Sequence, residues 1–301
     1  MLPLMIIIAL GFASKQLGVL TRADVEKMNT VIFDVFMPFM MFENIRSSDL
    51  QSAIDLRLIA FAVGGVLLLF LAGLAFAVVY TKDNDIRPVI AQDIFRSNFV
   101  IMGFPIARSL MGDADISQAV VLMATVVPTF NILAVVCLSI FGKGKTTLKG
   151  ICLQIVKNPL VMGTVAGILF KLSGLTLPTA VASVTKSMGN AVSPVIIFLL
   201  GAFLEFGGFK KYRKPIIVTS VIRLVIAPAL MLTAAYFLGF RGVEFAALIG
   251  VFGSSAAISS FTMVQQMGGN SDLAGELVVV TSALCCLTLF GWCMCFKLLG
   301  L

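Results

Sequence analysis

The residues best suited to bind a solute are polar side chains and helix breakers set inside long apolar segments. One such segment contains Asn98, Gly103 and Pro105. Proline removes a main-chain donor and clashes with the carbonyl four residues earlier, and glycine permits unusual dihedral angles. Inside a membrane, the main-chain groups freed by such a break must find polar partners. We therefore predict a broken helix whose Asn98, Gly103 and Pro105 face a substrate. The alternative is a simple proline kink with Asn98 bonded to a neighbouring helix.

A hydroxyl-rich run occupies the corresponding place in the second half of the chain, at 253–261, and it contains no proline. In the functional interpretation, Ser254, Ser255 and Ser259 offer neutral hydrogen bonds to a substrate. In the structural alternative, the serines bond back to carbonyls four residues earlier and bend a helix, or the small residues let two helices approach closely. The sequence leaves both interpretations open.

Ionisable side chains inside apolar segments are costly in a membrane, and each one is a functional candidate. Arg223 could neutralise an anionic substrate or extend to the membrane surface. It could also pair with a buried carboxylate, for which the candidates are Asp93, Asp34 and Glu43. Asp93 itself is expected to pair locally with Arg96, three residues further along. We therefore treat Arg223 and Asp93 as candidate charge or coupling residues.

The chain contains an internal repeat at a constant offset of 156 residues. The matching positions carry residues that fix backbone shape more than they add hydrophobicity, and they include Gly11 and Gly167, Gly18 and Gly174, Pro38 and Pro194, and Tyr80 and Tyr236. A duplicated membrane half is typical of secondary transporters. Asn44 and Asn190 lie close to the two repeated prolines, and they are further candidates to face a substrate cavity.

The composition places the chain in a membrane. Of its 301 residues, 59% are hydrophobic and 12% are charged, and the mean hydropathy is +1.05; soluble proteins carry about 25% charged residues. The net charge of +7 does not indicate nucleic-acid binding, because the basic residues lie in short loops between apolar segments. The sequence has no histidine, which removes histidine-based catalysis and metal binding. We expect no enzyme activity, no cofactor and no metal site, and we expect the cysteines to be packing residues without disulfides.

Apolar segments of about 20 residues cross a bilayer, and ten such segments can be recognised. They cover roughly 2–20, 28–47, 57–80, 88–111, 116–141, 151–172, 180–205, 215–238, 244–268 and 274–298. Because each repeat then has an odd number of spans, the second copy must insert upside down. We predict a first repeat over 1–141, a cytoplasmic linker over 142–150 and an inverted second repeat over 151–301. The distribution of Lys and Arg places both termini outside.

Several motifs follow one another in a fixed order along nearly the whole chain: Asn98-x4-Gly103-x-Pro105 with Gly112-Asp113, the run from Val31 to Phe42, Lys157-Asn158-Pro159-Leu160, and Pro194 with Gly201. Together they resemble the auxin efflux carrier family. The short central linker is similar to that of bacterial members, which are described as carriers of malate or malonate, and not to the long cytosolic loop of the plant carriers. Ser260 or Phe261 stands where the plant relatives carry a second proline.

The resemblance implies an all-α polytopic membrane protein with ten transmembrane helices in two inverted five-helix repeats. This is a bile-acid/sodium symporter-like, NhaA-like fold with broken crossover helices. Spans 1, 2, 6 and 7 would form a scaffold that also makes a homodimer, spans 3–5 and 8–10 a moving transport domain, and spans 4 and 9 would cross at the substrate.

The expected function is a secondary transporter in the bacterial inner membrane. It would move small organic anions, such as malate, malonate or auxin-like acids, by alternating access. Coupling to protons, to sodium or to no ion stays open. The alternative is a membrane-embedded sensor that binds a ligand without net transport.

Overall fold

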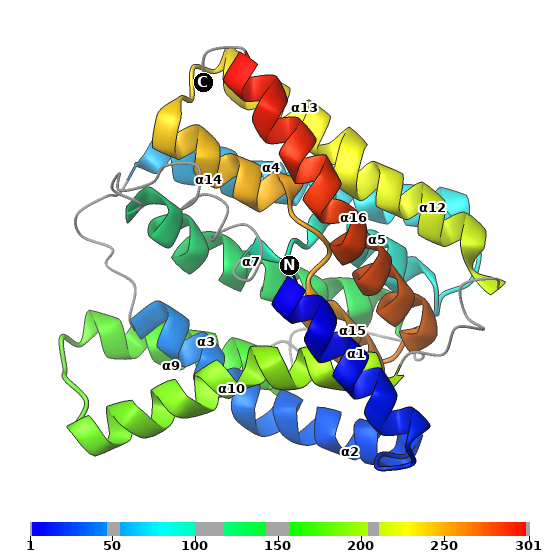
Figure 1. Ribbon diagram of the computed structural model, residues 1–301. Helices are drawn as coiled ribbons and strands as arrows, with labels where there is room; N and C mark the ends of the chain where they lie inside the picture. Colours follow the sequence, from blue (N-terminus) through cyan, green and yellow to red (C-terminus); the bar gives the residue numbers. More distant parts are fainter. Residues whose placement is uncertain (1, 47–54, 100–116, 143–156, 204–210, 299–301) are drawn as a thin grey trace.

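The computed structural model describes residues 2–46, 55–99, 117–142, 157–203 and 211–298, and within these ranges the chain is helical and forms no β-sheet (Figure 1). The elements are α1 (Leu2–Gln16), α2 (Arg22–Val31), the π-helix η1 (Ile32–Phe36), α3 (Met37–Arg46), α4 (Leu56–Tyr80), α5 (Arg87–Phe95), α7 (Ser117–Phe141), α9 (Pro159–Leu172), α10 (Thr179–Phe203), α12 (Arg213–Val221), the π-helix η3 (Ile222–Ile226), α13 (Ala227–Phe237), α14 (Gly242–Gly253), α15 (Ile258–Met267) and α16 (Ser271–Leu298). The predicted all-α class is confirmed.

Several of these helices are long and apolar enough to cross a membrane. Within the described ranges four helices meet both conditions, and a fifth does so if the bent pair Ser271–Cys285 and Leu287–Cys295 counts as one span. The four are Leu56–Tyr80, Val121–Phe141, Thr179–Phe203 and Arg213–Phe237. Shorter apolar helices cover Ile6–Gln16, Pro159–Leu172 and Gly242–Gly253. The chain is therefore a polytopic membrane protein.

Two helical segments contain a π-helical turn shortly before a proline. η1 precedes Pro38, and η3 precedes Pro228. Proline lacks a main-chain donor and displaces the carbonyl four residues earlier, so a kink or π turn commonly occurs at such a site. At η3 the freed carbonyl belongs to Leu224, and Nε1 of Trp292 donates a hydrogen bond to it at 3.0 Å. This bond fixes α16 against the turn that carries Arg223.

The helices pack in two groups. In the first group α1 packs along α10, and α9 packs along α3, with α2 beside α10 (Figure 1). In the second group α4 packs on α5 and α7, α13 packs on α14, and α16 contacts α12, α14 and α15. α15 belongs to the contact zone between the groups, because it touches α2 and α10 as well as α5 and α7. Residues of α15 therefore lie where the two groups meet.

Glycines permit the closest helix contacts in the first group. A Cβ atom placed on Gly11 of α1 would lie 2.0 Å from the carbonyl oxygen of Phe198 in α10. A Cβ atom on Gly167 of α9 would lie 3.0 Å from the carbonyl oxygen of Phe42 in α3. The offset of 156 residues relates Gly11 to Gly167 and Phe42 to Phe198. Positions matched in the sequence repeat thus make corresponding contacts.

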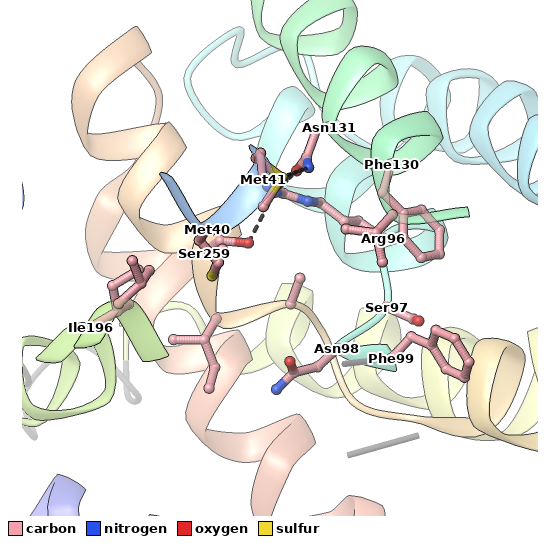
Figure 2. A pocket seen from close by; sticks show the side chains of 14 residues that line it. Met40, Met41, Arg96, Ser97, Asn98, Phe99, Phe130, Asn131, Ile196 and Ser259 are labelled. Atoms are coloured by element: carbon pink, nitrogen blue, oxygen red, sulfur yellow. Dashed lines mark hydrogen bonds between the residues drawn. The ribbon is translucent and has the colours of Figure 1, made fainter. Parts of the chain in front are cut away.

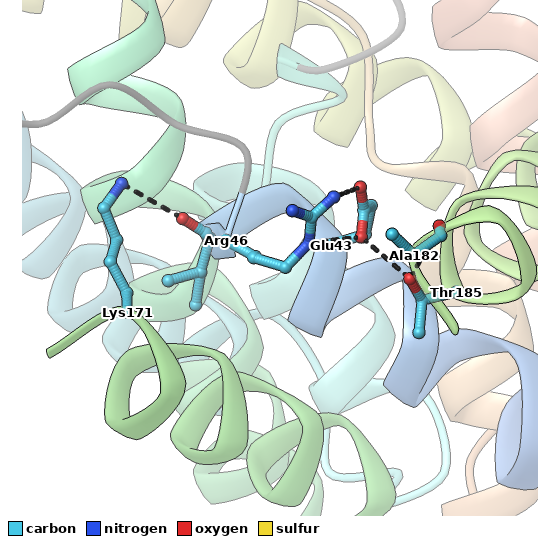
Figure 3. A network of polar contacts seen from close by, with 6 residues as sticks. Glu43, Arg46, Lys171, Ala182 and Thr185 are labelled. Atoms are coloured by element: carbon cyan, nitrogen blue, oxygen red, sulfur yellow. Dashed lines mark hydrogen bonds and ion pairs between the residues drawn. The ribbon is translucent and has the colours of Figure 1, made fainter. Parts of the chain in front are cut away.

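A polar network fixes α3 against its neighbours in the same group (Figure 3). Glu43 accepts hydrogen bonds from Arg46 at 2.9 and 2.5 Å and from the hydroxyl of Thr185 in α10 at 3.2 Å. Nζ of Lys171 in α9 donates to the carbonyl oxygen of Ile45 at 3.3 Å. Glu43, one of the three candidate carboxylate partners of Arg223, is therefore engaged within the first group.

We expect Gly11→Ala to lower the free energy of unfolding by about 1–3 kcal/mol, because the added methyl group forces α1 away from α10. The matched control is Gly64→Ala in α4, where an added Cβ meets no atom within 4 Å and alanine favours the helix. Thermal unfolding in detergent, followed with a thiol-reactive dye that reports exposure of buried Cys137 and Cys285, measures both variants. Equal stability of the two variants would contradict the close contact.

Candidate functional site

Two helices, α5 and α14, are each followed by an extended segment, and these two segments pair with each other. α5 ends at Phe95, after which Arg96 has φ −91° and ψ 109°. α14 ends at Gly253, and the chain stays extended until α15 begins. The main-chain N–H of Asn98 donates to the carbonyl oxygen of Ser255 at 2.8 Å, and that of Ala257 donates to the carbonyl oxygen of Arg96 at 3.2 Å. This antiparallel pairing satisfies main-chain groups that the membrane cannot satisfy.

Polar side chains help to end α14 at this point. The hydroxyl of Ser254 donates to the carbonyl oxygen of Gly250 at 2.6 Å, which is the back-bonding expected of serine in a helix. The N–H of Ala256 donates to the hydroxyl of Thr281 in α16 at 3.2 Å. The hydroxyl-rich run at 253–261 therefore contains a helix break, and the bond from Ser254 to Gly250 is the serine back-bonding that the structural alternative predicted.

Arg223 joins the C-terminal ends of α5 and α14. Its side chain is fully buried. Nε and Nη2 donate to the carbonyl oxygen of Ser254 at 3.0 and 2.8 Å, and Nη1 donates to the carbonyl oxygen of Ile94 at 3.2 Å. The C-terminus of a helix carries about half a negative charge, so two such ends together offset about one guanidinium charge. The predicted extension of Arg223 to the membrane surface is wrong, because the side chain is buried. For the predicted pairing with a carboxylate, the described hydrogen bonds of Arg223 go to carbonyls instead.

A cavity lies beside the crossing, which is the antiparallel pair formed by residues 96–98 and 255–257 (Figure 2). Its lining comes from α3, α7 and α10, from the segment that follows α5, and from the start of α15. The polar part consists of Arg96, Ser97, Asn98, Asn131 and Ser259, and the apolar part of Met40, Met41, Phe99, Val127, Phe130, Val192, Ile196, Ala257 and Ile258. The residues described in this lining therefore offer one positive charge and several neutral polar groups within a mainly apolar wall.

Arg96 supplies that charge, and its partners are neutral. Nη2 donates to Oδ1 of Asn131 at 2.7 Å and to the hydroxyl of Ser259 at 2.9 Å, as Figure 2 shows. Nη1 lies 2.9 Å from Sδ of Met263 and 3.4 Å from Oε1 of Gln92. Within the part of the chain that the structure describes, Arg96 forms no ion pair. A buried guanidinium without a counter-ion is costly, and a guanidinium can form charge-assisted hydrogen bonds with a carboxylate.

Two further features of the cavity suit an anion. The first turn of α15 contributes Ile258 and Ser259 to the lining, and the positive end of a helix dipole favours negative charge. Nδ2 of Asn98 is buried without a hydrogen-bond partner in the described structure. An unpaired buried donor is costly unless a bound group accepts from it. Arg96, Asn98 and the start of α15 thus present donors to one cavity.

Of the serines and the asparagine predicted to bind the substrate, some line the cavity and others lie behind it. Asn98 and Ser259 line the cavity. Ser254 and Ser255 are fully buried and are not part of the lining. The carbonyl oxygens of these two serines accept the hydrogen bonds from Arg223 and from the N–H of Asn98. Ser254 and Ser255 therefore support the crossing through their main chain.

The remaining candidates lie elsewhere. Asn190 is exposed on α10 and is not part of the lining. Gly103, Pro105 and the side chain of Asn44 lie outside the described residues. Asp93 is buried in α5, and neither of its carboxylate oxygens accepts a hydrogen bond from a described residue. The predicted local pair of Asp93 with Arg96 is therefore wrong.

We expect Arg223→Gln to destabilise the protein strongly, since each buried carbonyl left without a donor costs about 1–3 kcal/mol. The matched control is Arg241→Gln. Arg241 also donates to main-chain carbonyls at the C-terminal end of a helix, those of Tyr236 and Phe240 at 2.8 and 2.7 Å. It is exposed, so water replaces the lost bonds and the change should stay within about 0.5 kcal/mol. Equal losses of thermal stability in the two variants would refute the capping role of Arg223.

Comparison with known proteins identifies the family to which this arrangement belongs. Residues 1–293 match the model of a family described as membrane transport protein. An uncharacterized transporter of Methanothermobacter thermautotrophicus is 23% identical over 301 residues, covering 97% of this chain and 95% of the relative. One of Methanocaldococcus jannaschii is 22% identical over 304 residues, covering 97% and 96%. These relatives indicate a transport protein and not an enzyme. The chain belongs to the membrane transport protein family, which is the auxin efflux carrier family that its motifs resemble.

Proposed function

We propose that the protein is a secondary transporter of small organic anions, in which Arg96 binds the carboxylate of the substrate. The observation that carries this proposal is a buried guanidinium that lines a central cavity and has neutral partners in the described structure. Asn98 and the first turn of α15 supply further donors to the carboxylate. Alternating access would expose this cavity to each side of the membrane in turn, as the helix groups move against each other.

The lining favours a particular class of anion. The described part of the lining contains one guanidinium and side chains such as Met40, Met41, Phe130 and Ile196. A second carboxylate on the substrate would have to lose water without gaining a positive partner from these described residues, which is costly. An amphipathic monocarboxylate therefore suits the cavity better than a dicarboxylate such as malate or malonate.

The proposed architecture has ten spans in two inverted repeats, over 1–141 and 151–301, joined by the linker at 142–150. Matching backbone geometry supports it, because Gly18 and Gly174 both have positive φ, at 73° and 66°. The first helix group, which contains α1, α2, α3, α9 and α10, would be the scaffold and would form the homodimer. The second group would move. Both termini would face outward from the cytoplasmic membrane.

We expect Arg96→Gln to weaken the binding of the transported anion at least about tenfold, because a charge-assisted hydrogen bond contributes about 1.5–3 kcal/mol. Arg96→Lys should recover part of the loss. The matched control is Arg87→Gln, at the start of the same helix, where Arg87 donates to Thr81 and Asn84. Counterflow in proteoliposomes with malate, malonate, indole-3-acetate and benzenesulfonate measures exchange for each variant.

The counterflow outcomes separate the candidate functions. Saturable exchange of one anion, lost in Arg96→Gln and kept in Arg87→Gln, supports the carrier. Saturable binding without exchange, in wild-type protein that elutes as a single species, would favour the sensor. Exchange that survives Arg96→Gln unchanged would refute the role of Arg96.

Asn98→Ala should weaken substrate binding by a few fold, since a neutral hydrogen bond contributes about 1 kcal/mol. The main-chain bond from Asn98 to Ser255 is kept in this variant, so the crossing itself should persist. Asn84→Ala, in an exposed loop, serves as the control. Unchanged transport kinetics in Asn98→Ala would remove Asn98 from the site.

A further inference from the structure

Asp93 is a buried carboxyl group that the proposed anion site does not use. It lies in the last turn of α5, with a relative exposure of 3%. Neither carboxylate oxygen accepts a hydrogen bond from any residue that the structure describes. The C-terminal turn of a helix also disfavours a negative charge. An ionised carboxylate in this place is therefore costly, and the group needs a proton or a compensating positive charge.

The elements packed against α5 supply few charges that can compensate Asp93. α5 contacts α4, α7, α12, η3, α15 and α16. The titratable and charged groups of the described parts of these elements are Arg57 and Tyr80 in α4, Cys137 in α7, Arg213 and Lys214 in α12, Arg223 in η3, and Asp272, Glu276, Cys285, Cys293 and Cys295 in α16, with none in α15. Of these, Arg223 interacts electrostatically with Asp93. Its described hydrogen bonds nevertheless go to the carbonyls of Ser254 and Ile94.

A proton suits Asp93 better than a metal cation. Hard cations take about six oxygen ligands, and no group of three or more acidic, cysteine or histidine side chains occurs among the described residues. The positive charge of Arg223 opposes a second cation nearby. The unpaired buried atom of the neighbouring Gln92 is an amide nitrogen, which is a donor and cannot bind a cation.

We propose that Asp93 binds the proton that is carried together with the substrate anion, so that the protein is a proton–anion symporter. This inference rests on the proposed function, because it needs Arg96 to hold the anion. A proton from water on one side forms an O–H bond with the Asp93 carboxylate, and the same bond breaks when the proton leaves to the other side. No group is oxidised or reduced.

Charge balance couples the two cargoes. In the loaded carrier the anion neutralises Arg96, and Asp93 is neutral because it holds the proton. In the returning carrier Asp93 is ionised beside Arg223, with which it interacts electrostatically. Its negative charge then offsets the charge of Arg96 in the total, without an ion pair between Asp93 and Arg96. The two residues with their cargo therefore carry no net charge in either form. A carrier with only one cargo would bring an unbalanced charge into the membrane interior, which is costly.

The test uses full-length protein in proteoliposomes, with the anion that gives the fastest counterflow in the panel above. Wild type, Asp93→Asn and Asp93→Glu are compared with Asp34→Asn, which removes an exposed carboxylate from η1. Net uptake is measured under a pH gradient, under a sodium gradient at equal pH, and under a valinomycin-imposed potential. Pyranine trapped inside reports proton entry, and protein-free liposomes correct for diffusion of the protonated acid.

We expect wild type and Asp34→Asn to accumulate the anion about tenfold for each unit of pH gradient, since one proton accompanies each anion. The sodium gradient and the potential should have no effect. Asp93→Asn, which mimics the protonated group permanently, should keep exchange and lose net uptake and proton entry. Asp93→Glu should keep proton entry.

Other results overturn the symport. Uptake driven by the potential alone indicates uniport of the anion, and uptake driven by sodium indicates a different coupling ion. Proton-coupled uptake that persists in Asp93→Asn assigns the proton to another group. If Asp93→Asn does not fold, pyranine measurements on wild type and Asp93→Glu still decide whether a proton enters with the anion. Absence of anion exchange in wild type instead refutes the proposed function itself.

Discussion

The arrangement around the cavity depends on the hydrogen bonds that satisfy the main-chain groups at the ends of α5 and α14 in an apolar environment. Asn98 and Ala257 each donate a hydrogen bond across the antiparallel pairing, and Arg223 caps the carbonyls of Ile94 and Ser254. Without these bonds the extended segments would leave unpaired polar groups in the interior, at a cost of several kcal/mol. One side chain from η3 thus holds together two helix ends that are far apart in sequence.

The same construction separates two buried arginines into different roles. Arg223 has two negative helix ends beside it and is balanced by the fold. Arg96 emerges from the break, reaches the cavity wall and has amide, hydroxyl and sulfur partners. A charge that the fold neutralises is structural, whereas a charge that the fold leaves in a cavity attracts a counter-charge from outside. The proposal that the protein binds an anion follows from this difference.

Sequence patterns predicted the helical class and the positions of the four long apolar helices, because apolar length is a local signal. A break near Asn98 was also predicted, and α5 ends at Phe95, before Asn98; Gly103 and Pro105, on which that prediction relied, lie outside the described residues. Sequence patterns did not predict the partners of Arg96. The spacing of Asp93 and Arg96 brings side chains together only within a continuous helix, but α5 ends at Phe95. The partners of Arg223 are carbonyls 129 and 31 residues away in the chain. Every peptide unit carries a carbonyl, so no residue type marks such a partner in the sequence.

The bond between Trp292 and the carbonyl freed by Pro228 has a spectroscopic consequence. The chain contains a single tryptophan, and its indole N–H is bonded to Leu224, the residue next to Arg223. Intrinsic tryptophan emission therefore originates from one place, where α16 meets the turn that caps the crossing. The emission depends on the polarity and hydrogen bonding around that indole, so any rearrangement of η3 against α16 alters the spectrum. The native protein thus reports movement at its own crossing without an added label.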